Sequence, residues 1–259
     1  MSDATDAILP PAGTPAAPAT APADRHRAGA VTALDLIHLA QGFYFVFWGL
    51  LLTLMMAAQM LAGIPLPPVL ETLLAAGVLG TLVGTWRLSQ ARHCGDRWHS
   101  QADQALGWAV LMTYAAVFVY LWRWVPTSLY LQTNALMFPV VCILYMVAFN
   151  RATATLATSL GNQDLHRESQ FCSIGALALL LAPFLGLLGY AAGMAYLHGE
   201  SLFSSLRMVL SHVHAAWVVI VLLPVALTLS LAWGAKDMVL HLLAACEPEP
   251  PPPTTSSPV

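Results

Sequence analysis

The sequence predicts an all-α, polytopic integral membrane protein with six transmembrane helices and both termini in the cytoplasm. Composition is the first reason. Hydrophobic residues make up 58% of the 259 residues, and charged residues make up only 9%, against about 25% in an ordinary soluble domain. The second reason is that the charges are clustered, so that long uncharged stretches remain between them. A bilayer core of ~30 Å is crossed by ~20 helical residues, and the stretches reach this length.

Six stretches qualify as spans. Four of them contain no Asp, Glu, Lys or Arg: 36–64, 124–150, 169–199 and 208–235. Two are less clear: 69–88 carries Glu71 and Arg87 near its ends, and 104–122 lies between Asp103 and Arg123. All six are continuously apolar and do not alternate between polar and apolar residues, which argues against a membrane β-barrel.

The flanking segments differ in composition from the spans. Residues 1–31 are rich in Ala and Pro, and 247–259 are rich in Pro, so we expect two disordered tails around a membrane domain at 32–246. The first 30 residues lack a basic start followed by an apolar stretch, so no cleavable signal peptide is expected.

The distribution of the ten cations predicts the orientation. If the chain crosses the membrane six times, two of these cations lie on one side, Arg123 and Arg207. Eight lie on the other side: Arg25, Arg27, Arg87, Arg92, Arg97, Arg151, Arg167 and Lys236. The excess of Lys and Arg marks the cytoplasmic face. Because Arg outnumbers Lys nine to one, as in chains from GC-rich bacteria, we expect a multi-pass protein of the bacterial inner membrane.

Two spans carry glycines at positions i, i+3 and i+7, which share one face of a helix. The sets are Gly77, Gly80 and Gly84 in "GVLGTLVG" and Gly186, Gly189 and Gly193 in "GLLGYAAG". Small residues let membrane helices approach closely and gain dispersion contacts. We therefore expect both faces to pack against helices, within the chain, in a homo-oligomer or in a protein partner. The alternative is the general enrichment of Gly in membrane helices.

A polar stripe begins the first span, where Asp35, His38 and Gln41 follow each other at steps of three. Ionisable groups within a span face protein or water, and they often mark ion or proton pathways. The other interpretation, which we favour, makes Asp35 a helix-start residue favoured by the helix dipole. His38 and Gln41 would then pack against a neighbour.

Other polar groups predict little chemistry. No phosphate-binding loop, zinc-protease helix or nucleophile elbow occurs, so no catalytic residue is predicted. The run "RHCGDRWH" contains His93, Cys94, Asp96 and His99, but it matches no standard zinc spacing. We expect no metal and no cofactor. A periplasmic polar cluster is a further candidate: Glu200, Arg207 and His212.

The function predicted from these patterns is non-enzymatic: an accessory, scaffolding or complex-forming membrane subunit whose surroundings are the lipid bilayer. The alternative is a small secondary transporter or proton-coupled permease that uses Asp35, His38 and Gln41. The net charge of −3, without a basic stripe, gives no indication of nucleic-acid binding.

Overall fold

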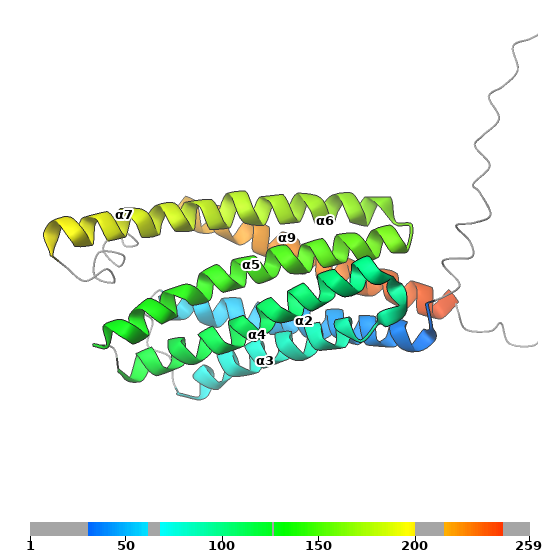
Figure 1. Ribbon diagram of the computed structural model, residues 1–259, viewed down its shortest axis with the longest axis horizontal. Helices are drawn as coiled ribbons and strands as arrows, with labels where there is room; N and C mark the ends of the chain where they lie inside the picture. Colours follow the sequence, from blue (N-terminus) through cyan, green and yellow to red (C-terminus); the bar gives the residue numbers. More distant parts are fainter. Residues whose placement is uncertain (1–30, 62–67, 126, 200–214, 246–259) are drawn as a thin grey trace, which may run out of the picture.

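The computed structural model describes residues 31–61, 68–125, 127–199 and 215–245, and every regular element in them is a helix (Figure 1). In chain order they are α2 (Ala33–Leu61), α3 (Pro68–Ser89), η1 (Arg92–Cys94), α4 (Asp96–Trp124), α5 (Leu129–Ser159), α6 (Gln163–Ala176), η2 (Leu177–Leu181), α7 (Ala182–His198) and α9 (Ala215–Ala245). The helical class predicted from the sequence is confirmed.

Five helical segments are long and apolar enough to cross a membrane within the described residues. They are Ala33–Met55, Asp96–Trp122, Leu129–Ser159, Gln163–Leu197 and Leu223–Ala245. The sequence predicted six spans. The stretch that is not among the five belongs to α3, which is 22 residues long and carries Glu71 and Arg87.

Several helices extend beyond the uncharged stretches from which they were predicted. α4 begins at Asp96, α5 continues to Ser159, and α9 contains Lys236 well before its end at Ala245. The sequence interpretation had placed Lys236 after the sixth span. A helix needs no lipid to satisfy its backbone hydrogen bonds, so it continues through polar turns whose side chains reach water. Charge therefore marks the border of the apolar region, and the helix ends lie elsewhere.

The long helices form a closed ring of neighbours. Each packs on the next in the order α2, α3, α4, α5, α6 and α9, and α9 returns to α2. Side chains fill the centre of the ring, where Phe43 of α2 meets Phe149 of α5 with ring centroids 5.9 Å apart. Both phenylalanines are almost fully buried, as are Met112 of α4 and Leu231 of α9.

Hydroxyl and amide groups join helices inside this core. The Tyr145 hydroxyl of α5 lies 2.8 Å from the Thr85 hydroxyl of α3. The amide of Asn150 donates to the Thr228 hydroxyl of α9 at 3.1 Å, and the Ser169 hydroxyl of α6 donates to the Asn150 carbonyl oxygen. Every one of these side chains is buried, so the polar pairs fix α5 against three of its neighbours.

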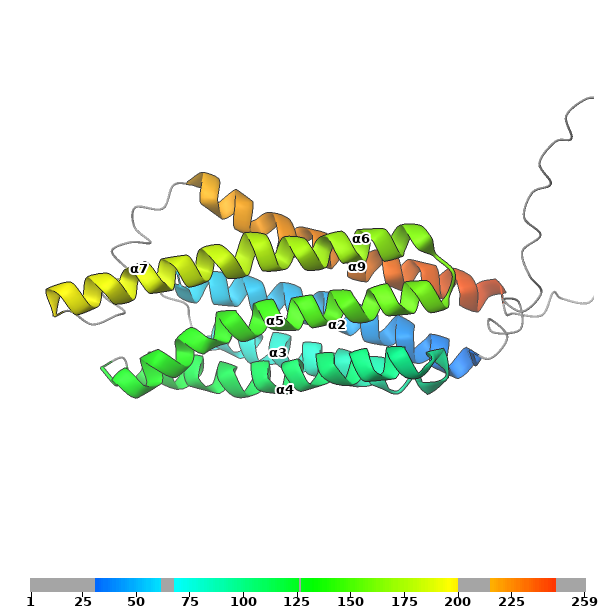
Figure 2. The same ribbon diagram turned by 45° about the horizontal axis from the view of Figure 1, so that its top comes forward.

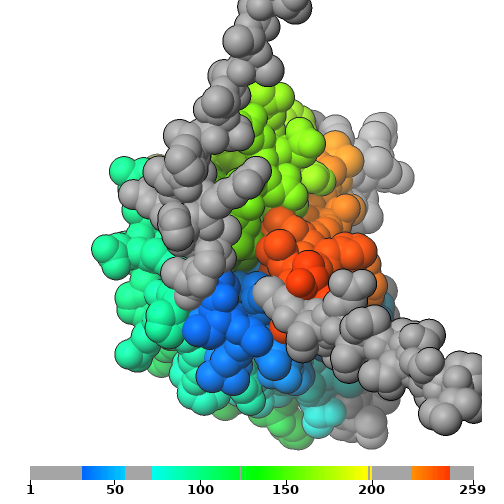
Figure 3. All heavy atoms as spheres, turned by 90° about the vertical axis from the view of Figure 1, so that its right-hand side faces the viewer, coloured from blue at the N-terminus to red at the C-terminus, as the bar shows by residue number. Residues whose placement is uncertain are grey.

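α6, η2 and α7 follow one another without a break and form one rod. Figures 1 and 2 show that its α7 portion extends past the ends of the neighbouring helices. The opposite end of the bundle holds the start of α2, η1, the start of α4, the turn between α5 and α6, and the end of α9. We call it the Asp35 end. Viewed from there, the start of α2 lies beside the end of α9 (Figure 3).

Candidate functional site

Asp35 lies at the start of α2 and is 4% exposed. Thr32 precedes the first helical residue, and its side-chain oxygen accepts from the backbone N–H of Asp35 at 3.2 Å. In return, the Asp35 carboxylate accepts from the Thr32 backbone N–H at 3.1 Å and from the Thr32 hydroxyl. This reciprocal pair is a capping box, which satisfies backbone donors that a helix start otherwise leaves free.

A second partner reaches the same carboxylate from another element. His93 belongs to η1, and its Nδ1 lies 2.9 Å from Oδ2 of Asp35. A carboxylate only accepts, so the proton of this hydrogen bond is on Nδ1. The His93 side chain is 62% exposed, whereas that of Asp35 is 6% exposed. The pair therefore joins a buried carboxylate to an imidazole that is open to the surroundings, and it connects η1 to the start of α2.

Cys94 lies next to this pair and is buried. Burial raises the pKa of its thiol to about 12, and the negative charge of Asp35 contributes to the increase. The thiol therefore stays protonated near neutral pH, and it is a poor nucleophile and metal ligand. Trp98 of α4 fixes the start of η1, because its indole N–H donates at 3.0 Å to the carbonyl oxygen of Ala91, the residue before η1.

The predicted stripe is not one site in the structure. His38 is half-buried and Gln41 is exposed, and no hydrogen bond in the described part of the chain joins either of them to Asp35. Asp35 instead meets His93, 58 residues further along the chain. The sequence had singled out His93 only as a possible metal ligand. The predicted topology carried the missing signal, because it puts the connection after the second span on the same side as the start of the first.

The donor atoms at the Asp35 end do not form a metal centre: among the described residues no group of three or more His, Cys, Asp or Glu side chains could hold a metal ion. Glu200, Arg207 and His212, the predicted periplasmic cluster, lie outside the described residues.

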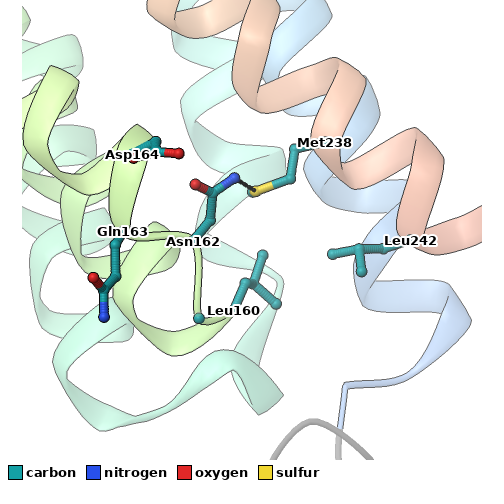
Figure 4. Close-up of a pocket in the computed structure, with 7 residues that line it drawn as sticks. Leu160, Asn162, Gln163, Asp164, Met238 and Leu242 are labelled. Atoms are coloured by element: carbon teal, nitrogen blue, oxygen red, sulfur yellow. Dashed lines mark hydrogen bonds between the residues drawn. The ribbon is translucent and has the colours of Figure 1, made fainter. Parts of the chain in front are cut away.

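An open groove of about 530 Å³ lies at the Asp35 end, between the turn from α5 to α6 and the last turns of α9 (Figure 4). Leu160 and Leu242 supply apolar walls, and the amide of Asn162 donates to the Met238 sulfur at 3.5 Å. Its lining is completed by Gly161, Gln163 and Asp164. Because the lining contains a carboxylate and no Lys, Arg or His, the groove is a poor site for phosphate or other anions.

The glycine face of α3 packs directly on α2. A methyl group added at Gly77 would lie 2.8 Å from the Thr53 backbone nitrogen, and one added at Gly84 would lie 2.7 Å from the Val46 backbone nitrogen. Gly80 is less tightly enclosed, with 3.4 Å to the Cα of Gly49. The two backbones therefore approach so closely that only glycine fits at Gly77 and Gly84.

The glycine face of α7 has different surroundings. A methyl group added at Gly186, Gly189 or Gly193 would meet nothing within 4 Å in the described residues. All three are exposed, and they lie on the side of α7 away from the buried Ala191. The same glycine spacing is thus enclosed in α3 and open in α7.

Comparisons with protein-family models, with curated proteins and with solved structures give no match for this chain.

Proposed function

We propose that the protein is a non-enzymatic, complex-forming subunit of the bacterial cytoplasmic membrane, and that it assembles through α7. The observation that carries the proposal is the open glycine face of α7: Gly186, Gly189 and Gly193 lie on an apolar helix, and a methyl group added at any of them would meet nothing within 4 Å in the described residues. In lipid, small residues on one face favour close association of helices.

The orientation forms part of the proposal: six spans, with both termini in the cytoplasm. α3 supports the sixth span because it lies along α2 from Gly42 and Gly84 to Thr53 and Gly77. The described cations nearest to the Asp35 end are Arg87, Arg92, Arg97, Arg151, Arg167 and Lys236, whereas Arg123 lies towards the other end. This asymmetry favours the Asp35 end as the cytoplasmic one.

We assign the partner of α7 to a second copy of the chain. The contact between α2 and α3 shows what such a glycine face requires: Gly49 lies against Gly77 and Gly80, and Gly42 lies against Gly84. Glycine meets glycine, because close approach requires small residues on both helices. A second α7 presents the same glycines, and a twofold axis along the membrane normal brings identical faces together.

The test is the oligomeric state of the purified protein, measured by native mass spectrometry in mild detergent and by single-molecule photobleaching in lipid nanodiscs. We expect a dimer, and we expect Gly189→Leu to reduce the dimer fraction at least about tenfold, because the added side chain separates the helices.

Gly107→Leu is the matched control. Gly107 is an exposed glycine in the middle of α4, and an added methyl group there also meets nothing within 4 Å in the described residues. The control should leave the dimer intact. A wild-type protein that is monomeric in both environments, or a Gly189→Leu variant that dimerises normally, contradicts the assignment.

The alternative, a proton-coupled permease, has less support. Its pathway would begin at Asp35, but that carboxylate is already engaged by Thr32 and His93, and Gln41 faces outward. The buried hydroxyls of Thr53, Thr81 and Thr85 donate to carbonyl oxygens of their own helices. The Thr85 hydroxyl can therefore only accept from the Tyr145 hydroxyl of α5, and a proton would not pass from Thr85 to a further helix.

A further inference from the structure

The rod formed by α6, η2 and α7 has a firmly packed half. In α6, Ser169, Cys172 and Ala176 are fully buried. The Ser169 hydroxyl donates to the Asn150 carbonyl oxygen of α5, and α6 packs on both α5 and α9. The Asn162 side chain caps its first turn by accepting from the backbone N–H of Leu165 at 3.0 Å. This half therefore moves with the bundle.

The hydrogen-bond ladder of the rod changes where this half ends. η2 is a π-helix, and the backbone N–H of Ala182 bonds to the carbonyl oxygen of Leu177, five residues earlier. Pro183 follows directly and has no N–H, so no backbone hydrogen bond forms from this position. Single π-turns of this kind are rare and often occur at functional sites.

The packing of the rod also becomes sparse here, with Phe184 the last residue of the rod that packs against the main core in the described structure. Leu180 of η2 is buried, but beyond Pro183 the one buried residue of α7 in the described structure is Ala191. Ala191 forms a small cluster with Leu136 of α5, separate from the main core. Further along, Tyr196 is 89% exposed.

The other two prolines within helices have different surroundings. Pro139 lies in α5 between the buried residues Phe138 and Val141, and Pro224 lies in α9 one turn before the fully buried Thr228. Neighbouring helices hold both sides of the break at Pro139, and they hold the Thr228 side of the break at Pro224. A missing hydrogen bond becomes a flexible point where packing is also sparse, and among the side chains that the structure describes this coincidence occurs at η2 and Pro183.

We propose that residues 177–183 form a pivot on which α7 swings relative to the rest of the bundle. The movement changes the distance between α7 and the first half of α5, and it reorients the face that carries Gly186, Gly189 and Gly193. The pivot is a property of a single chain and is independent of whether α7 binds a second copy.

Pulsed electron–electron resonance between spin labels tests the pivot. One label replaces Leu129 at the start of α5, and the second replaces either Tyr196 in α7 or Phe171 in α6; all three side chains are well exposed. The background has Cys94, Cys142, Cys172 and Cys246 replaced by Ala, and excess unlabelled protein removes distances between copies. We expect the 129–196 distance distribution to be at least about twice as wide as the 129–171 distribution.

Pro183→Ala should narrow the 129–196 distribution, because it restores a backbone donor, and should leave 129–171 unchanged. Pro139→Ala is the matched control and should change neither. Equal widths for the two pairs would refute the pivot, and a wide 129–196 distribution that Pro183→Ala does not narrow would refute its location.

Hydrogen–deuterium exchange keeps the test independent of the cysteine replacements, because it uses the unmodified protein. We expect backbone amides of 184–190 to exchange at least about tenfold faster than those of 169–176, with the change at η2. Uniform protection across 169–190 would contradict the pivot. A monomeric protein that shows both the wider 129–196 distance distribution and the faster exchange of 184–190 would disprove the proposed dimer and leave the pivot established.

Discussion

α3 and α7 carry the same glycine spacing, but the structure uses it differently. In α3, Gly77 and Gly84 lie against the backbone of α2, and an added methyl group would collide with it. In α7, a methyl group at Gly189 would meet nothing within 4 Å in the described residues. A glycine pattern thus identifies a face that can approach another helix. Whether that face is filled depends on the neighbour.

The neighbour of α3 is suited to it in three ways. α2 supplies Gly42 and Gly49 opposite the glycines of α3, and the Thr53 hydroxyl donates to its own helix at Gly49, 2.8 Å away. α2 also lies directly before α3 in the chain, which makes the antiparallel contact easy to form. α7 has no such complement among the described helices, because its glycines lie opposite the side that carries Ala191.

Gly77→Leu is expected to show the largest difference in folding stability between the glycine face of α3 and that of α7. The new side chain would start 2.8 Å from the Thr53 backbone nitrogen and 3.0 Å from the Gly49 carbonyl oxygen. Backbone atoms cannot move aside cheaply, so we expect a loss of at least about 3 kcal/mol of folding stability. Thermal unfolding in detergent, followed by circular dichroism, measures it.

Two further substitutions complete the series. Gly80→Leu should cost less, about 1 kcal/mol, because its nearest contact is 3.4 Å away. Gly189→Leu, measured under conditions in which the protein is monomeric, should change stability by less than about 0.5 kcal/mol. If Gly189→Leu destabilises the monomer as much as Gly77→Leu does, the two glycine faces are equally enclosed and the contrast between them is wrong.

Asp35→Ala tests how much the contacts of Asp35 at the start of α2 contribute to folding stability. The substitution removes the capping box with Thr32 and the hydrogen bond from His93, so we expect a loss of about 2 kcal/mol. His93→Ala removes only the second of these and should cost about 1 kcal/mol. Equal losses from both substitutions would mean that the cap contributes nothing and that His93 alone fixes the carboxylate.

Cys94 reports on the Asp35 end through the reactivity of its thiol. Its thiol pKa is raised from 9.0 to about 12, so at pH 8 its thiolate fraction should be about 1,000-fold below that of an unfolded chain. Iodoacetamide should therefore modify Cys94 in native protein far more slowly than after denaturation. Mass spectrometry of the peptide that contains Cys94 measures the ratio, and rapid modification of the native protein would show that the η1 region opens.

The pH dependence of stability follows from the same pKa. Because the pKa is higher in the folded protein than in the unfolded chain, the folded state holds the proton more tightly. The contribution of the protonated Cys94 thiol to folding stability is therefore fully present below pH 9 and is lost as the pH rises from about 9 to about 12. Cys94→Ala should reduce this decline in an alkaline titration of the melting temperature, and an unchanged decline would assign it to other groups.

Much of the fold could be predicted from the sequence, because in lipid the backbone must be satisfied within each helix. The uncharged stretches located the apolar regions, and the helix limits were missed because helices continue through polar turns such as the one that begins α4 at Asp96. Of the two residues that form the candidate site, the sequence allowed the structural role of only one to be predicted. Asp35 was recognised as a helix-start residue, but its partner His93 lies 58 residues away, and no local pattern connects them.

The sequence by itself determined the helical class, the apolar segments and the helix faces on which glycines lie, because these depend on composition and on a period of 3.6 residues. Tertiary structure alone decided which face is enclosed. Gly77 meets Gly49 and Asp35 meets His93 because the ring of helices brings distant segments together. The glycines of α7 stay open in the described structure, because after η2 the rod packs on the bundle only sparsely and through its other side, which carries Ala191. The periodicity of one helix specifies its faces, but only the packing of all helices specifies their neighbours.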